Sequence, residues 1–291
     1  MAGDPAPARP LVEALESAAA LDEPGKAVGK AVRGAISPGA LKDALSGTWL
    51  GHALHPMLTD VVIGAFMSAT LLDVLGGDDD GRAAERLLSV GIAAYGPTAL
   101  SGVNDWADSE IADPAVRRVG LVHAASNAVA LSLYTSSLVA RRRGSLGRGK
   151  LLAAAGTAVM GAAGYLGGHM SLVRGVGPNQ TAFDPGPDDW TDAAAAGDLE
   201  PGKPLAVVVG DTPVFLLRHA DGLHAMHDRC SHRGCPLTDG EVDGETIQCG
   251  CHGSRFSLRD GAVERGPATS GQPAYEVRER DGKVEIKLPS G

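Results

Sequence analysis

Four cysteines and two histidines near the end of the chain constrain its fold more than any other feature. All four cysteines of the 291-residue protein lie in RCSHRGCPLTDGEVDGETIQCGCHGSRF, residues 229–256. Cys230 and His232 form a C-x-H pair, and Cys249 and His252 form a C-x-x-H pair. Each pair offers one sulfur and one nitrogen, whereas zinc fingers usually place the two kinds of ligand on different hairpins. The pattern therefore favours a [2Fe–2S] cluster. A zinc knuckle with two spare cysteines is the alternative.

The motifs CSHRGCPL and CGCHGSRF resemble the signature of Rieske iron–sulfur proteins. The resemblance covers about residues 202–291 and implies a small all-β domain that binds a [2Fe–2S] cluster. It also implies that Cys230 and Cys249 bind one iron, while His232 and His252 bind the other.

The other two cysteines indicate a subclass. In the Rieske proteins of cytochrome bc-type complexes, cysteines at the positions of Cys235 and Cys251 form a disulfide, and Ser254 matches a serine that donates to a bridging sulfide. Ferredoxins and ring-hydroxylating oxygenases usually lack this cysteine pair. Phe256 departs from the subclass, which often has a tyrosine there, and Arg233 replaces an apolar residue. Fewer donors to sulfur lower the potential, so we expect a value above the ferredoxin type but below the highest members.

Four long apolar segments precede this region, at residues 57–75, 87–104, 119–140 and 151–173. Each is about long enough to cross the hydrocarbon core of a bilayer, and the last three lack Asp, Glu, Lys and Arg. Short polar loops separate them. We therefore predict a four-helix transmembrane domain over residues 48–174. A soluble bundle rich in alanine and glycine is the alternative.

The apolar half also resembles a known family. GHALHPMLTDVVIGAFMSATLLDVL and the later YLGGH are similar to an uncharacterised four-helix membrane domain of unknown function that is often fused to Rieske domains. The resemblance spans about residues 48–180 and brings no established chemistry.

The remaining segments complete the domain plan. Residues 1–47 read as a helical and disordered tail, disordered over residues 1–9. Within it, residues 25–36 form a helix that lies on a membrane surface or packs on the next domain. Residues 175–201 read as a polar linker rich in proline, glycine and aspartate. Residues 202–291 form the Rieske domain, with strands predicted at residues 205–209, 214–218, 223–227, 246–248, 254–258, 274–280 and 284–288.

Charge distribution predicts the orientation of a multi-pass protein in the cell membrane. The first and third loops between apolar segments carry seven Lys and Arg residues, against four near the opposite side. The positive-inside rule then places those loops in the cytoplasm and the Rieske domain outside it. The third loop, RRRGSLGRGK, is an ordinary positive loop or resembles an internal twin-arginine export signal.

Polar residues gather where the apolar segments meet the side predicted to hold the Rieske domain. They are His52, His55, Asp60, His123 and His169. Such groups can cap helices, line a quinone pocket or ligate haem or another metal.

Together these features predict a membrane-anchored one-electron carrier that works between a membrane donor, such as a quinol or haem, and a protein acceptor. The protein is then an electron-transfer component of oxidoreductase type. The chain stops after the β domain, so we do not expect a complete oxygenase. Supplying electrons to an oxygenase and non-catalytic redox sensing are the alternatives. The net charge of −9 argues against nucleic acid as a partner.

Overall fold

The protein forms two compact units in a computed structural model that describes residues 8–77 and 80–289. The helical unit contains Leu54–Val176 and the chain before Ser37. The β unit contains Ser37–Ala53 and the chain from Gly177 onward. Of the start expected to be disordered, residues 1–7 lie outside the described residues, and Arg9 already begins a helix.

Each predicted apolar segment lies in one long helix. These helices are α4 (Leu54–Leu75), α5 (Gly81–Ser109), α6 (Pro114–Arg142) and α7 (Leu146–Leu172). Within the part of the chain that the structure describes, α4 and α7 are the helices long and apolar enough to cross a bilayer. Crossing by α5 and α6 stays a prediction.

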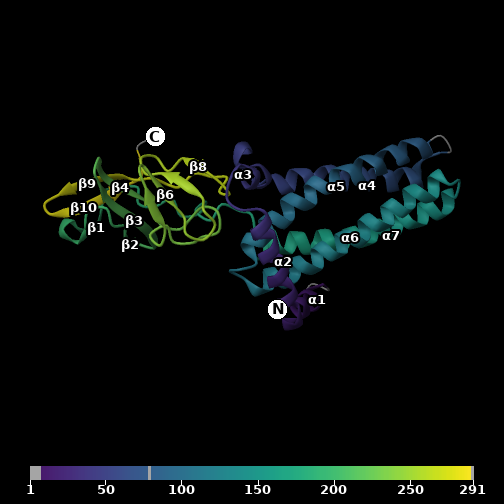
Figure 1. The fold of residues 1–291 in the computed structure, drawn as a ribbon, viewed down its shortest axis with the longest axis horizontal. Helices are drawn as coiled ribbons and strands as arrows, with labels where there is room; N and C mark the ends of the chain where they lie inside the picture. Colours follow the sequence, from purple (N-terminus) through teal and green to yellow (C-terminus); the bar gives the residue numbers. More distant parts are fainter. Residues whose placement is uncertain (1–7, 78–79, 290–291) are drawn as a thin grey trace, which may run out of the picture. The chain divides into compact units, whose positions relative to one another are not determined.

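The long helices pack as two pairs, α4 along α5 and α6 along α7 (Figure 1). Phe66 of α4 and Tyr134 of α6 stack face to face between the pairs, with ring centroids 3.9 Å apart. A side chain at Gly91 would collide with the Phe66 ring, and one at Gly156 would crowd Tyr134. Small residues therefore make room for the aromatic stack, and they let the helices approach closely.

Short hydroxyl contacts join three helices beside the same aromatic stack. Tyr134 Oη lies 2.8 Å from Thr157 Oγ1 of α7, which lies 2.9 Å from Thr70 Oγ1 of α4. Because each hydroxyl has a partner inside the bundle, an apolar environment imposes little penalty on these polar groups.

The two first helices, α1 (Arg9–Glu16) and α2 (Asp22–Ala35), pack against this bundle. Arg33 of α2 and Arg117 of α6 both contact Glu110, at 2.8 and 2.5 Å. Gly25 and Gly29 lie against Arg117 and Glu110, so a larger residue there would displace the ion pairs. Of the two predictions for residues 25–36, the structure supports packing on the next domain.

The β unit contains three antiparallel sheets. Their strand orders are β1-β10-β9, β2-β3-β4 and β5-β6-β7-β8. The strands are β1 (Thr191–Ala195), β2 (Leu205–Val209), β3 (Thr212–His219), β4 (Gly222–His227), β5 (Glu241–Asp243), β6 (Thr246–Gln248), β7 (Arg255–Ser257), β8 (Val263–Arg265), β9 (Glu276–Arg280) and β10 (Lys283–Lys287). All seven predicted strands are present, and β1, β5 and β8 are additional.

Two apolar clusters hold these sheets together. One surrounds the fully buried Leu216, Val284 and Ile286, and the other surrounds Phe215, Ile247 and Phe256. The second cluster also contains Cys230 and Cys249, so the motif cysteines are anchored directly in the core.

Two segments differ from the predicted domain plan. Residues 175–201, predicted as a linker, contribute β1, which pairs with β10. The tail residues 37–47 belong to the β unit and form the short helix α3 (Ala40–Ser46), followed by the 3₁₀ turn η2 (Thr48–Leu50). Neither segment has the alternation of apolar residues from which strands and domain boundaries are read.

Candidate metal centre

Two loops with the same backbone pattern carry the Cys and His pairs. In the first loop, Gly234 N donates to Cys230 O at 2.8 Å, and Cys230 N donates to Cys235 O at 2.8 Å. In the second, Gly253 N donates to Cys249 O at 3.0 Å, and Cys249 N donates to Ser254 O at 2.8 Å. Both glycines have positive φ, 77° and 81°, which glycine adopts without strain.

The loops place four possible ligands together. Cys230 and Cys249 are free thiols, each 1% exposed. The rings of His232 and His252 have centroids 5.1 Å apart and are nearly perpendicular. Cys235 and Cys251 form a disulfide between the loops, with its sulfurs within 4.8 Å of Cys249 Sγ. These two sulfurs are bonded to each other, so the unbonded thiols are Cys230 and Cys249.

The electrostatics of the site fit metal binding. A hydrogen bond between the two thiols lowers the pKa of Cys249 and raises that of Cys230, since the sulfurs share a proton. Burial lowers the pKa of His232 well below its usual range, and the charges of Arg233 and Lys42 add to this effect. Thiolate and neutral imidazole are the forms that bind metals. The lowered pKa of Cys249 and the neutral His232, beside the second cysteine and the second histidine, fit a [2Fe–2S] cluster with mixed ligands.

Comparison with known families agrees with this geometry. Residues 189–276 match the family model described as Rieske [2Fe-2S] domain. The ferredoxin subunit of anthranilate 1,2-dioxygenase from Burkholderia cepacia is 33% identical over 100 residues, which are 34% of this chain and 93% of that protein. The chain belongs to the Rieske [2Fe–2S] family. The resemblance noted in the sequence is therefore confirmed, and the cofactor is a [2Fe–2S] cluster.

Other relatives match the same third of the chain. Ferredoxin CarAc of Metapseudomonas resinovorans is 33% identical over 98 residues, covering 33% of this chain and 92% of that protein. Among solved structures, the ferredoxin of carbazole 1,9a-dioxygenase from Nocardioides aromaticivorans IC177 is 28% identical, covers 35% of this chain and 100% of that chain, and has a TM-score of 0.33. Residues 51–180 match a family described as a predicted membrane protein, DUF2231, which confirms the second resemblance.

A third loop of the Rieske domain braces the first cluster loop. Its Gln272, 4% exposed, accepts from Ser231 N at 2.7 Å and donates to Arg229 O at 2.6 Å and His227 O at 2.7 Å. Ser231 Oγ donates to Ser270 O at 2.7 Å. The sequence analysis missed Gln272, because nothing local distinguishes a structural glutamine from an exposed one.

Two residues singled out from the motif are fully buried. Ser254 Oγ accepts from Ala268 N at 3.0 Å, which fixes the oxygen and leaves its own hydrogen available to donate. Phe256 packs in the core of the domain beside the motif cysteines, where it provides no polar donor. The sequence motif predicts a donating hydroxyl at Ser254 and no donor at Phe256, and these surroundings are compatible with both.

Residues 37–53 pack against the loops of the Rieske domain. Thr48 Oγ1 donates to Ala268 O at 3.2 Å, and a Cβ at Gly253 would lie 3.1 Å from Pro38 Cγ. A side chain at Gly266 would collide with Thr48 and Asp43. This segment also brings Lys42, 3% exposed, close enough for its charge to act on His232. The predicted tail therefore forms part of the surroundings of the cluster.

A buried histidine outside the motif supports the first cluster loop. His227 Nδ1 accepts from Arg229 N at 3.0 Å, so Nε2 carries the hydrogen that is donated to Asp184 Oδ2 at 3.0 Å. Asp184 also accepts from Thr212 Oγ1 at 2.6 Å. Burial lowers the pKa of His227, which keeps this imidazole neutral.

The polar residues predicted at one end of the bundle do not form one site. His123 Nδ1 lies 2.8 Å from Ala163 O and its Nε2 lies 3.1 Å from Asn127 Nδ2, so both ring nitrogens have partners. His169 Nε2 lies 2.8 Å from Glu16 of α1. His52 falls in the β unit and Asp60 is exposed.

His55 is the remaining member of the predicted set. Its Nδ1 lies 3.0 Å from Thr98 O, and its ring packs where a side chain at Gly102 would collide with it. The groups of three metal-ligating side chains found among the described residues include none of these membrane-end histidines.

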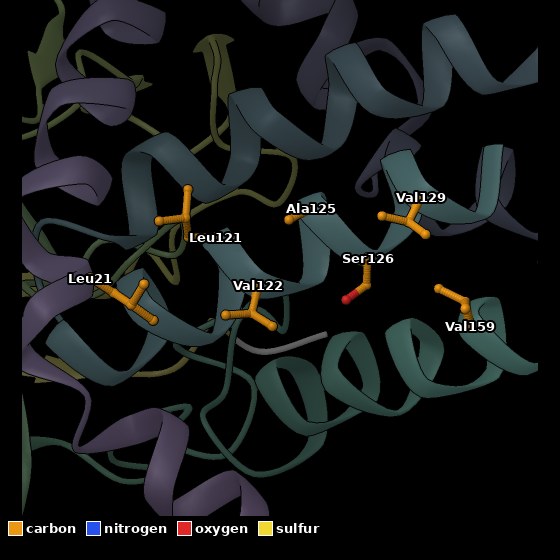
Figure 2. Close-up of a pocket in the computed structure, with 7 residues that line it drawn as sticks. All are labelled: Leu21, Leu121, Val122, Ala125, Ser126, Val129 and Val159. Atoms are coloured by element: carbon orange, nitrogen blue, oxygen red, sulfur yellow. The ribbon is translucent and has the colours of Figure 1, made fainter. Parts of the chain in front are cut away.

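An apolar groove of about 490 Å³ opens along the helical unit (Figure 2). Ser126 is the polar member of its lining, and the rest is apolar: Leu21, Leu121, Val122, Ala125, Val129 and Val159. The groove has the chemistry to hold a hydrocarbon chain.

We predict that Gln272→Leu loosens the first cluster loop. The substitution leaves one N–H and two carbonyls buried without a partner, at about 1–3 kcal/mol for each unsatisfied group. Cluster loss to a chelator, followed by visible absorption, should be faster, and the unfolding temperature should fall. Gln248→Leu is the control. It removes hydrogen bonds from the side chains of the half-buried Arg255 and Arg265, rather than bonds to the backbone of the first cluster loop. Equal rates in the two variants would remove the bracing role.

Acid should destabilise the Rieske domain through His227. Its folded pKa lies below the ordinary value of about 6.5, so its stabilisation is complete above that pH and is lost as the pH falls below it. The slope is at most about 1.4 kcal/mol per pH unit. Unfolding temperatures from pH 8 to 5 should fall less in His227→Gln than in the wild type. The exposed His52→Gln should keep the wild-type dependence of unfolding temperature on pH. A wild-type dependence in His227→Gln would contradict the prediction.

Proposed function

We propose that this protein is a membrane-anchored one-electron carrier. Cys230 and Cys249 would hold one iron of the cluster, and His232 and His252 would hold the other. When bound, the cluster accepts and releases single electrons. The observation that carries the proposal is the convergence of two buried thiols and two imidazoles on disulfide-linked loops in a Rieske domain.

The surrounding residues would hold the cluster rather than react. The disulfide links the two loops, and Gln272 holds the backbone of the first loop. The Ser254 hydroxyl would donate to a cluster sulfur, which stabilises the reduced form. Phe256 cannot add a second donor. We therefore propose a potential between those of ferredoxin-type and of the highest bc-type members.

The helical half would anchor this carrier by four crossings, α4 to α7. The lengths of α4 and α7 and the match to a membrane protein family support this proposal. Seven Lys and Arg residues in the first and third loops, against four opposite, favour a Rieske domain outside the cytoplasm. Fusing alkaline phosphatase to the C-terminus tests this orientation, since the enzyme is active outside the cytoplasm. An inactive fusion would reverse it.

A membrane quinol is the donor that we favour. The apolar groove could hold its hydrocarbon tail, because six of its seven lining residues are apolar (Figure 2). A haem donor within the bundle has less support, since His55, His123 and His169 each already bond a protein group.

Electron supply to an oxygenase is the second candidate. It is favoured by the relatives, whose names describe the ferredoxin component of an anthranilate dioxygenase and a ferredoxin, CarAc. In that case the donor would be a soluble reductase rather than a quinol, and the helical half would be an anchor.

Reduction kinetics separate the two candidates. Full-length holoprotein in detergent should lose visible absorption when a short-chain quinol is added and show the electron paramagnetic resonance signal of a reduced Rieske cluster. Reduction by an NADH-dependent flavoprotein reductase, with no response to quinol, would favour oxygenase supply. Purified protein with zinc and without iron would overturn both. An optical Soret band that His55→Ala removes would restore the haem donor.

Lys42 should raise the midpoint potential. Reduction adds a negative charge to the cluster, so a buried cation near His232 stabilises the reduced form. We predict that Lys42→Gln lowers the potential and Lys42→Arg restores it, measured by redox titration with electron paramagnetic resonance. A tenfold change in the ratio of reduced to oxidised cluster corresponds to about 59 mV. The exposed Lys26→Gln is the control, and an unchanged or higher potential in Lys42→Gln would refute the effect.

A further inference from the structure

A second cluster of metal-ligating side chains lies at the β3–β4 turn of the Rieske domain. His219 ends β3, Asp221 lies in the turn, and His224 is in β4. Asp221 Oδ1 lies 2.8 Å from His219 Nδ1 and 2.9 Å from His224 Nε2. The three ligand atoms all lie within 4.8 Å of one another. None of these residues belongs to the cluster motif.

The second nitrogen of His224 defines how this ring is protonated. Nδ1 lies 3.0 Å from Leu258 O, a group that can only accept a hydrogen bond. A neutral His224 therefore carries its hydrogen on Nδ1, and Nε2 presents a lone pair toward Asp221 Oδ1. Two lone pairs at 2.9 Å repel each other. This contact needs a cation, which is either a second proton on the ring or a metal ion between the two atoms.

The arrangement around His224 is the usual one for a metal ligand. A ligating histidine commonly donates its other ring N–H to a backbone carbonyl, which fixes the tautomer and the orientation of the ring. Leu258 O does this here, and the Leu258 side chain is 2% exposed in the core of the domain. The side chains of His224 and His219 lower the pKa of Asp221 to about 2, so the carboxylate is ionised at any physiological pH.

We infer that His219, Asp221 and His224 form a binding site for a divalent transition metal of the zinc class. Two imidazole nitrogens and one carboxylate oxygen are ligands that zinc takes, with bonds of about 2.0–2.2 Å. Neighbouring ligands in a tetrahedral zinc site with such bonds are about 3.3–3.6 Å apart, so side-chain rotations that widen the separations of 2.8 and 2.9 Å would admit the ion. Asp221 is largely exposed, which leaves room for water as a further ligand.

A metal there would pin the β3–β4 turn to the strand that leaves the second cluster loop. β7 follows that loop directly, and Leu258 follows β7. The site offers no sulfur, so it differs chemically from the cluster site. Iron–sulfur binding at the cysteines and zinc binding at the turn are therefore separable events.

Zinc titration of the full-length holoprotein tests the inference. Isothermal calorimetry should show one zinc ion bound per chain while the visible spectrum of the cluster is unchanged. Zinc X-ray absorption should show only nitrogen and oxygen neighbours, at about 2.0–2.2 Å, with no sulfur at about 2.3 Å. His219→Gln, Asp221→Asn and His224→Gln should each weaken binding at least tenfold, and Asp260→Asn, an exposed turn carboxylate, should not.

Three outcomes overturn the inference. The first is that zinc does not bind, and the second is that it binds to all three variants as well as to the wild type. The third is a spectrum that shows sulfur, which would place zinc at the cluster cysteines. In the first case the contact between His224 and Asp221 would be an ion pair with a protonated ring. The unchanged cluster spectrum shows that each variant is folded, so loss of binding reports on the turn alone.

Discussion

The Rieske domain depends on holding two irregular loops at a fixed separation. Each loop is closed by backbone hydrogen bonds to its own cysteine, and neither forms regular structure across the ligands. Loops of this kind would move independently without cross-links. Three connections limit this movement: the Cys235–Cys251 disulfide between the loops, the bonds of Gln272 to the first loop, and the anchoring of Cys230 and Cys249 in the apolar core. The rest of the domain is the frame that positions these connections.

The sequence predicted the parts of this arrangement that depend on residue type at fixed spacing. The Cys and His pairs, the position of the second cysteine pair and seven strands with alternating or apolar runs belong to this class. It could not predict Gln272 or Asp184, because their importance comes from groups far away in the chain. β1 was missed for a similar reason: TDAAA has low strand propensity and is held in the sheet by β10.

The helical half shows where residue type misleads. Histidines at one end of a predicted membrane bundle suggested a shared site, yet His123 and His169 each bond a group on a neighbouring helix. His123 joins α6 to α7, and His169 joins α7 to α1. Glu110, buried between Arg33 and Arg117, serves the same purpose and drew no attention in the sequence. Polar residues in an apolar setting need partners, and helix packing supplies them as readily as a ligand does.

The chain passes between the two units three times. The chain leaves the helical unit after Ile36, contributes residues 37–53 to the β unit, returns at Leu54, and leaves again after Val176. The ferredoxin relative from Burkholderia cepacia aligns with only 100 residues of this chain, so residues 37–53 lie outside that stretch. This segment brings Lys42 to the cluster site and packs Thr48 against its third loop. The surroundings of the cluster therefore include a segment that the chain contributes just before its first long helix.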